Sequence, residues 1–471
     1  MDSFEGLDPG IADTLNSLNP SDEPEYEVSE AGLKDGLAVA EARQKWQAQS
    51  LRKLKGMKRA LETESEKTTS DEELAEMIFI ATAFDGEDNF ILPEARELAK
   101  DCLVRVTTIL RSCGAKHLSN AIRIVLNVRM KPLFLSSSHP GVNLSTGRKL
   151  HISNGSHPST TDFYDDQTWK AEGQGCWNTL RWCIGNLEQS DFETLWPLLI
   201  PPLMTMLDDH DLYFRIAAIK ILQILLHRVD GSLLKRTGIE SLFAASLSIS
   251  VTYYNDAEAP KLLLEAIKCS QQLIELTTPP GSRERFERIC DMATKAVIGG
   301  AWLYAGDNLL IMEASVQALI PVVSTMGIGT CRFLKALIPQ LSENLIPKPS
   351  LPHSHRLLQL SADCLIIVIE VCKPRIYPWK GAILEGLLRA WVYSQTDGIR
   401  DPDNTSFQQR LLSLRSTLQT ACPGLVDNEF RKALACDKCM FEELLLPSTV
   451  GVEGKAGSVE PTASFVKDLD T

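Results

Sequence analysis

The chain has 471 residues, of which 44% are hydrophobic and 23% are charged, so it contains ample apolar material for a folded core. Its formal net charge of −13 argues against general nucleic-acid binding, because neutralising phosphate groups requires clustered Lys and Arg side chains. Cysteines are spread along the chain and several lie in apolar helical stretches, which suits a reducing compartment better than a disulfide framework.

The amino terminus reads MDSFEGLDPGIADTL, with acidic residues where a secretory signal would have a basic start and an apolar block. No uncharged apolar run approaches the roughly 20 residues that are needed to span a bilayer. We therefore expect neither a secretory signal nor a membrane segment, and we expect a cytoplasmic and nuclear location.

Residues 1–70 are expected to form a mostly disordered arm. Its first part is acidic and rich in turn formers, whereas residues 42–61, ARQKWQAQSLRKLKGMKRAL, form a basic and weakly amphipathic helix candidate. A polar run, ETESEKTTSDEE, follows this candidate. We interpret the arm as solvated and flexible; a nuclear address and a target helix of the calmodulin-binding type are the alternatives.

The rest of the chain reads almost entirely as helices. Apolar residues recur at helical spacing from Glu72 to Leu446, strand signals are scarce, and the candidate helices end at Gly or Pro. The predicted fold class is therefore all-α. Along the chain we expect an N-terminal helical segment at 71–136, a flexible polar loop at 137–163, helical repeats at 164–446 and a disordered tail at 447–471.

Residues 192–229 show how the helices pair. The first helix carries one continuous apolar stripe, made of Trp196, Leu199, Ile200, Leu203 and Leu207. Pro201 and Pro202, together with Pro197, should bend this helix or break its first turns, because each proline removes a backbone donor. The second helix is apolar on most sides, so it must lie between neighbouring helices.

The proline-bearing helix recurs later in the chain. ALIPQLSENL (336–345) aligns with LLIPPLMTML (198–207), so that Pro339 falls on Pro201, and a second apolar helix follows in both places. Repeating helix pairs of about forty residues are typical of HEAT-type solenoids, in which each pair buries its apolar face against the next. We predict a HEAT-like α-solenoid of stacked antiparallel helix pairs.

The turn between the paired helices contains three carboxylates and an imidazole, Asp208, Asp209, His210 and Asp211. In a HEAT-like pair such a turn carries Asp, and the following helix carries a cation a few residues on, which here is Arg215. An Asp at the start of a helix caps unpaired N–H groups, worth about 1 kcal/mol, and its charge complements the positive helix end. We interpret the turn as structural.

The competing hypothesis is a metal-dependent hydrolase at 208–211. Adjacent carboxylates on one turn point in divergent directions, and no second cluster of His and acidic residues at ligand spacing supports them. The chain also lacks a G-x-S-x-G elbow, an H-E-x-x-H pair and a G-x-x-x-x-G-K-[ST] loop. We therefore expect no enzyme, no cofactor and no metal.

Cys436 and Cys439 form a lone C-x-x-C motif. Without a second pair, a zinc ion would need a distant ligand such as Cys422, and no βαβ pattern surrounds the motif to indicate a redox site. The sequence leaves open whether these two thiols bind a metal.

Three blocks of the sequence, in this order, resemble one known family. They are Ile200 to Leu203 (IPPL) followed by Leu207 to Asp211 (LDDHD), then Lys335 to Ser342 (KALIPQLS), and then ADCLIIVIEVCKPRI at 362–376. Over about residues 175–420 the chain is similar to the second Tel-two-interacting protein (Tti-two) family, the smallest subunit of the Triple-T (TTT) cochaperone complex. In the third block Pro374 and Arg375 match, whereas Lys373 stands where the family usually has Trp.

The resemblance implies a non-catalytic α-solenoid that acts as a scaffold or adaptor. Members of the family bind the largest Triple-T subunit directly, itself a long HEAT solenoid, and through it the Tel-two subunit. The complex delivers phosphatidylinositol-kinase-related kinases, the TOR, ATM and ATR class, to the ninety-kilodalton heat-shock chaperone, and so supports TOR signalling, DNA-damage checkpoints and telomere maintenance. An unrelated HEAT-repeat adaptor, such as a transport or phosphatase scaffold, is the alternative.

Three aromatic residues near the turn KPRIYPW are the candidates for partner binding: Trp379, Trp391 and Tyr393. Aromatic residues at the centre of an interface usually dominate its binding energy. The same side chains could instead fill the core of the solenoid, and the sequence does not decide between the two.

Overall fold

The computed structural model describes residues 33–63, 70–88, 91–150, 168–171, 173, 175–346, 354–396 and 402–446. Every regular element in this part of the chain is helical, and its single β contact is an isolated antiparallel bridge between Val142 and Lys149. The predicted all-α fold class is confirmed. The chain divides into two compact units, Met1–Arg332 and Phe333–Thr471.

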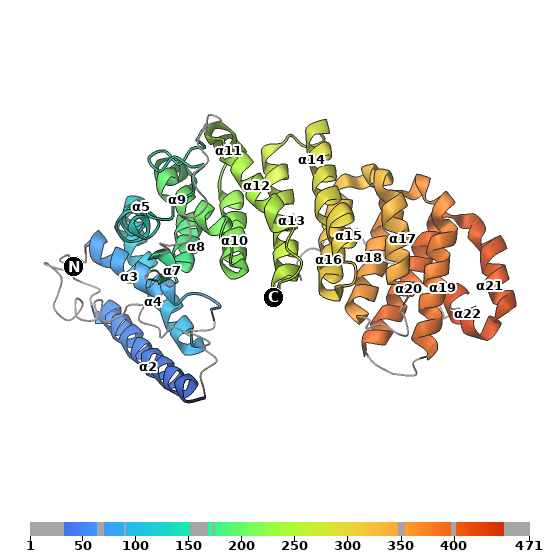
Figure 1. The fold of residues 1–471 in the computed structure, drawn as a ribbon, viewed down its shortest axis with the longest axis horizontal. Coiled ribbons are helices and arrows are strands. Elements are labelled where there is room, and N and C mark those ends of the chain that lie inside the picture. The colour runs from blue at the N-terminus through green and yellow to red at the C-terminus, as the bar shows by residue number, and fades with distance from the viewer. Residues whose placement is uncertain are drawn as a thin grey trace, which may run out of the picture. The chain divides into compact units, whose positions relative to one another are not determined.

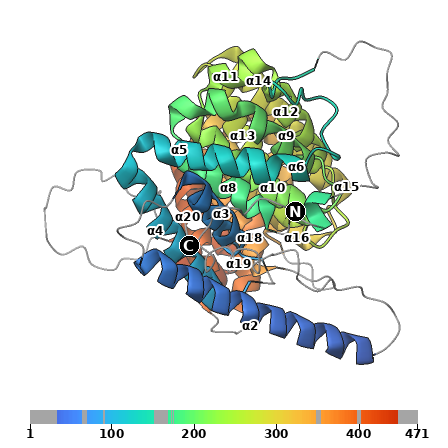
Figure 2. The ribbon, with the colours of Figure 1, turned by 90° about the vertical axis from the view of Figure 1, so that its left-hand side faces the viewer.

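The first unit begins with helices that gather around α3 (Asp71–Ala83). This helix contacts α4 (Pro93–Cys113), α5 (Ala115–Ile124) and α8 (Cys176–Asn186), and α2 (Leu33–Thr63) lies against α4 (Figure 1, Figure 2). The shorter elements are η2 (Val125–Met130), α6 (Lys131–Leu133) and α7 (Thr168–Ala171). Ser70 begins α3 with a capping box, in which its hydroxyl and the Glu73 carboxylate each accept a hydrogen bond from the other residue's N–H.

The rest of the first unit is a stack of antiparallel helix pairs. The first helices of the pairs are α9 (Phe192–Leu207), preceded by η3 (Gln189–Asp191); α12 (Ile239–Ser250), preceded by α11 (Gly231–Thr237); and the run α14 (Arg283–Ala293), η4 (Thr294–Ala301) and α15 (Trp302–Tyr304). The second helices are α10 (Leu212–Arg228), α13 (Ala259–Thr277) and α16 (Leu309–Met326), and η5 (Gly327–Phe333) follows. In Figure 1 the helices α10, α13 and α16 lie side by side, each packed on the next. This is the predicted HEAT-like arrangement.

The predicted apolar stripe of α9 is its buried face, since Leu199, Ile200, Leu203 and Leu207 are fully buried. The prolines do not break its first turns: α9 runs continuously from Phe192 to Leu207 with all three inside it. The Thr205 hydroxyl donates to the Pro201 carbonyl at 3.1 Å. Packing against neighbouring helices therefore outweighs the loss of backbone donors.

The second unit contains the helices α17 (Leu334–Asn344), α18 (His355–Val371), α19 (Lys380–Thr396) and α20 (Pro402–Ala421). Its shorter elements are η6 (Lys373–Arg375), η7 (Tyr377–Trp379), η8 (Pro423–Leu425), η9 (Val426–Phe430), α21 (Arg431–Cys436) and α22 (Lys438–Leu445). α18 packs on α17 and α20, and α19 packs on the same two helices. Gly386 permits the close approach of α19 to α17, because a Cβ at this position would lie 2.9 Å from the Ser342 carbonyl oxygen.

Residues 44–63 differ from the flexible arm that the sequence suggested. They belong to α2, whose apolar stripe, Leu54, Met57 and Leu61, is buried. Two of its basic residues face acidic residues of α4: Lys55 forms a 2.7 Å ion pair with Glu94, and Lys58 pairs with Asp101. The positive charge of this helix is thus used partly to dock it on its neighbour.

Part of the expected flexible loop, residues 137–150, is folded against the first unit. The Lys149 N–H donates to the Thr237 carbonyl at 3.0 Å. Gly147, with φ +64°, lies against Trp196 of α9, where a Cβ would be 2.8 Å from the Trp196 carbonyl oxygen. The expectation of flexibility is therefore wrong for this part of the loop. The disorder or flexibility expected at 1–32, 64–69, 151–163 and 447–471 concerns residues outside the described part of the chain.

One helical stretch in the described residues, Leu309–Asn344, is long and apolar enough to cross a membrane by length and composition alone. Of its most apolar window, 56% is buried inside the protein. Helices in the core of a stack pass the same test, and α16, which begins this stretch, packs on α13.

Candidate functional site

The acidic turn, Asp208 to Asp211, joins α9 to α10, and its three carboxylates face different parts of the first unit. Asp208 faces His139 from the folded part of the 137–150 loop. Asp209 faces Lys170 of α7, and Asp211 faces the first turn of α10. The turn therefore connects α9 and α10 to two segments that lie outside the helix pair.

Asp209 is the buried carboxylate of this turn, with a side chain that is 4% exposed. Its Oδ1 accepts hydrogen bonds from the Lys170 ammonium and from the Asp211 N–H, both at 2.8 Å. The Lys170 ammonium also lies 4.7 Å from the centroid of the Phe214 ring. A buried charge needs such pairing, because desolvation would otherwise cost more than the turn gains.

Arg215 was predicted to face a carboxylate of the turn, and its positive charge acts on Asp208, although its hydrogen bonds go to other groups. Its Nε donates to the backbone carbonyl of Asp209 at 3.0 Å, and its Nη1 donates to the Ser250 hydroxyl at 3.2 Å. The guanidinium lies 5.1 Å from the centroid of the Tyr253 ring. Arg215 therefore holds the backbone of the turn against α12, while Lys170 supplies the cation that pairs with Asp209.

Asp208 ionises more readily than an ordinary Asp. Burial alone would raise the pKa of its carboxyl, but hydrogen bonds from His139 and Ser246 and the positive charges of His139 and Arg215 outweigh burial, so the pKa is lowered. The His139 Nε2 lies 2.8 Å from the Asp208 Oδ2. The ionised form of Asp208 thus holds the 137–150 loop against the end of α9.

Asp211 is the cap of α10, where its Oδ1 accepts from the Tyr213 N–H at 2.9 Å. Burial and the negative charge of Asp209 raise the pKa of its carboxyl, although Lys170 opposes this. The predicted capping role is what the geometry shows.

The geometry gives no support to a metal site at 208–211. Asp208, Asp209 and Asp211 each have a different partner, and the His210 ring lies 3.6 Å from the Asp209 Oδ1. Among the described residues, no group of three or more His, Cys, Asp and Glu side chains is arranged to hold a metal ion.

The aromatic candidates for partner binding separate into two kinds. Trp391 is fully buried and its indole N–H donates to the Met440 carbonyl at 2.9 Å, so of the two alternatives it belongs to the core and not to a partner surface. Trp379 and Tyr393 are half-buried in η7 and α19. The exposed aromatic residue of this region is Tyr377, whose side chain is 61% exposed.

The other repeat-motif residues lie on the surface of the second unit. Pro339 is exposed within α17, and Pro374 and Arg375 are exposed in η6, the short link after α18. Cys436 and Cys439 are exposed at the adjoining ends of α21 and α22, whereas Cys422 is buried. The C-x-x-C thiols therefore have solvent access.

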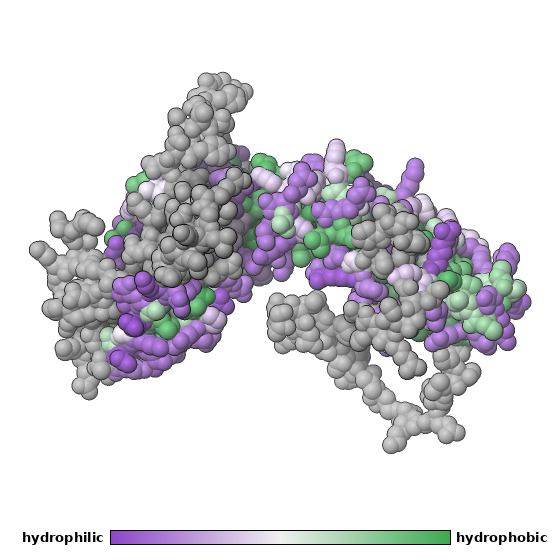
Figure 3. Space-filling model, turned by 60° about the horizontal axis from the view of Figure 1, so that its bottom comes forward, coloured by the Kyte–Doolittle hydropathy of each residue, from purple (hydrophilic) through white to green (hydrophobic). Residues whose placement is uncertain are grey.

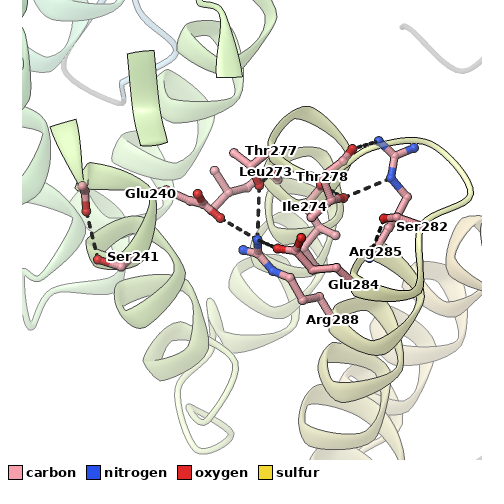
Figure 4. A network of polar contacts seen from close by, with 11 residues as sticks. Glu240, Ser241, Leu273, Ile274, Thr277, Thr278, Ser282, Glu284, Arg285 and Arg288 are labelled. Atoms are coloured by element: carbon pink, nitrogen blue, oxygen red, sulfur yellow. Dashed lines mark hydrogen bonds and ion pairs between the residues drawn. The ribbon is translucent and has the colours of Figure 1, made fainter. Parts of the chain in front are cut away.

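A polar network near the connection between α13 and α14 was missed by the sequence interpretation (Figure 4). Arg288 of α14 donates to the Glu240 carboxylate of α12 at 2.5 Å. Arg285 donates to the Thr278 hydroxyl at 3.1 Å and also to the carbonyls of Glu275 and Thr278. These two arginines tie α14 to the preceding helix pair.

One family model and several solved structures match the chain. The family model that matches is that of the Tti2 family, over residues 77–353, which is more than half of the chain. Among solved structures, importin β crystallised in ammonium sulfate is 12% identical with a TM-score of 0.47, and the match covers 94% of this chain and 50% of that one. An engineered protein is 12% identical with a TM-score of 0.38, and the match covers 93% of this chain and 97% of that one.

Importin β crystallised in polyethylene glycol is 13% identical with a TM-score of 0.35, and the match covers 94% of this chain and 58% of that one. The chain thus spans between half and three fifths of the length of the importin β chains. No curated protein gives a significant match. On the extent of the family match, the chain belongs to the Tti2 family.

Proposed function

We propose that this chain is a non-catalytic scaffold subunit of the Triple-T cochaperone complex. Membership of the Tti2 family carries the proposal, since the family match spans residues 77–353 and includes both the acidic turn and the stacked helix pairs. The geometry of the turn is consistent with it, because Asp208, Asp209 and Asp211 hold elements of the fold together.

In this role the chain binds the largest HEAT subunit of the complex directly, and the Tel-two subunit, the kinase clients and the heat-shock chaperone machinery indirectly. The assembled complex supports the chaperone-dependent maturation and stability of phosphatidylinositol-kinase-related kinases of the TOR, ATM and ATR class, and through them TOR signalling, DNA-damage checkpoints and telomere maintenance. The chain does so in the cytoplasm and nucleus, and it engages neither nucleic acid nor membrane. Stacked helix pairs suit this role because they present long surfaces to other proteins.

The experiment that tests this proposal is affinity purification of the tagged full-length chain, with the tag alone as the control. We expect the largest Triple-T subunit and the Tel-two subunit in stoichiometric amounts. Stoichiometric recovery of a transport or phosphatase assembly instead would favour the unrelated HEAT-repeat adaptor.

Metal analysis of the same purified protein tests the hydrolase hypothesis at 208–211. We expect no stoichiometric divalent cation, because the carboxylates of the turn already have other partners. A bound cation that is lost in Asp209→Asn would contradict the non-catalytic assignment.

A further inference from the structure

Three turns of the first unit lie along one edge of the helix stack. Residues 208–213, 252–258 and 303–310 connect the first helix of each pair to the second, and they lead into α10, α13 and α16. These three helices run in the same direction and pack side by side, so their amino-terminal ends lie on the same edge (Figure 1). We call these residues the turn edge.

The turn edge exposes large apolar side chains. The side chains of Leu303, Tyr304 and Leu310 are 67%, 73% and 60% exposed, and that of Tyr213 is 43% exposed. Three of these residues lie within eight positions of the chain, on either side of one short turn. Clustered exposed apolar side chains with a polar border mark interaction sites more often than isolated ones do.

The surrounding structure holds this apolar cluster in place. The Trp302 indole N–H donates to the Ser315 hydroxyl at 2.9 Å, which fixes the end of α15 to α16. The Asn308 Oδ1 accepts from the N–H groups of Leu310 and Ile311 at 3.1 and 3.2 Å. The exposed side chains are thus presented on a fixed backbone, so a partner would lose little free energy in ordering them.

The turn edge is also acidic. Its residues include six carboxylates and no Lys or Arg: Asp208, Asp209, Asp211, Asp256, Glu258 and Asp307. His139, Lys170 and Lys261 face Asp208, Asp209 and Glu258 from outside the edge, and the Arg215 guanidinium lies behind the first turn. The exposed acidity of the edge therefore rests on Asp211, Asp256 and Asp307, one in each turn, and the positive helix ends offset part of it.

The three turns form one surface. The Arg215 guanidinium of α10 lies over the ring of Tyr253, which joins the first turn to the second. The Tyr254 hydroxyl lies against Gly300 of η4, the element that leads into the third turn, since a Cβ at Gly300 would be 2.8 Å from that oxygen. Figure 3, in which the lower side of Figure 1 comes forward, shows hydrophobic and hydrophilic residues interleaved over the middle of the molecule.

We propose that the turn edge is the docking surface for a partner segment that carries Lys or Arg together with apolar side chains. The proposal rests on the proposed function, and it assigns the segment to the largest HEAT subunit of the complex. Charge complementarity with the carboxylates selects a basic segment, and the Leu303, Tyr304 and Leu310 cluster receives its apolar side chains. Nucleic acids and anionic lipid surfaces are repelled by the same charge.

The test measures the affinity of the purified full-length chain for the purified largest HEAT subunit. One edge variant removes apolar contacts, Tyr304→Ser with Leu310→Ser, and the other reverses charge, Asp256→Lys with Asp307→Lys. The matched controls change exposed residues away from the edge: Val104→Ser with Val128→Ser, and Glu87→Lys with Glu188→Lys. The conservative pair Asp256→Asn with Asp307→Asn repeats the charge test with little risk to folding, and thermal unfolding checks every variant.

We expect each edge variant to weaken binding about tenfold or more, and each control to stay within about twofold of the parent chain. We also expect the Asn pair to flatten the dependence of affinity on salt. Edge variants that bind like the parent chain would overturn the inference and leave the proposed function standing. A charge control that weakens binding as much as the edge variant would also overturn it. Failure of the parent chain to bind the subunit would contradict both the docking surface and the proposed function.

Discussion

Lys170 and Asp209 lie 39 positions apart in the chain and form a 2.8 Å ion pair whose carboxylate is 4% exposed. The pair joins α7, which precedes the repeats, to the turn between α9 and α10. With the contact between Asp208 and His139, it ties the acidic turn to segments outside the helix pair.

Lys170→Met should destabilise the protein by about 3 kcal/mol, because it leaves a buried carboxylate without its cation. We place the cost at the low end for a buried pair because Asp209 keeps its hydrogen bond from the Asp211 N–H. Urea unfolding measures the free energy. The double variant Lys170→Met with Asp209→Asn should lose less free energy of unfolding than the two single variants lose together. Additive losses would show that the two residues are not energetically coupled.

The ionised carboxylate of Asp208 should make stability depend on pH. Its pKa is lower in the folded chain than the ordinary value of 3.8, so between the two values the folded state binds fewer protons and stability rises with pH. The stabilisation is therefore complete above the ordinary value and is lost as pH falls through the lowered one. The difference in unfolding free energy between the parent chain and Asp208→Asn should be constant near neutral pH and shrink in acid. A difference in unfolding free energy that grows in acid would contradict the lowered pKa of Asp208.

Truncating the buried stripes should destabilise the stack. Leu203→Ala in α9 or Ile221→Ala in α10 should cost about 2–5 kcal/mol, because each leaves a cavity at a buried position. Val128→Ala is the control, since that side chain is 56% exposed, and it should change stability by less than about 0.5 kcal/mol. An unfolding temperature that scarcely changes in Leu203→Ala and Ile221→Ala would show that these two positions do not lie in the packed core.

Trp391 should affect stability and not partner binding. Trp391→Phe keeps most of the buried ring but removes the hydrogen bond to the Met440 carbonyl, so we expect a loss of about 1–3 kcal/mol. Affinity for the largest HEAT subunit, measured below the unfolding temperature, should equal that of the parent chain. A folded variant with reduced affinity would show that Trp391 contributes to partner binding.

Thiol labelling should follow burial. Cys113, Cys436 and Cys439 are exposed and should react first with a thiol reagent, and the half-buried Cys331 more slowly. Burial raises the pKa of the Cys102 thiol to about 11 and that of Cys364 to about 12, and it also raises the pKa of Cys176, Cys183 and Cys269. These thiols should react only after unfolding, which mass spectrometry of labelled peptides can check. Fast labelling of Cys183 in the native chain would contradict its assignment to the buried core.

The helix pairs could be predicted because their signal is local. Apolar residues at helical spacing, such as the stripe ending at Leu203 and Leu207, place a face in the core whatever the neighbours are. The helix cap at Asp211 could be predicted for the same reason, since a capping side chain bonds to the backbone of the next few residues.

The long-range partners of the acidic turn could not be predicted. His139 lies in a segment whose polar composition is typical of a flexible loop, and Lys170 follows that segment at the start of the predicted repeats. Both residues contact the turn through tertiary packing. Such long-range contacts produce no regular residue spacing that could be recognised in the sequence. The place of Trp391 could not be decided for a related reason: an aromatic residue near a turn suits a core and an interface equally, and only packing separates the two.

The abundance of the kinase clients shows whether the chain acts in their maturation. The chain is depleted from cells and replaced by the parent sequence, by the edge variant Tyr304→Ser with Leu310→Ser, or by nothing, and the steady-state levels of TOR, ATM and ATR kinases are measured. We expect all three kinases to fall without the chain and to return with the parent sequence, because a kinase that is not delivered to its chaperone is degraded. Normal kinase levels after complete depletion would contradict this expectation.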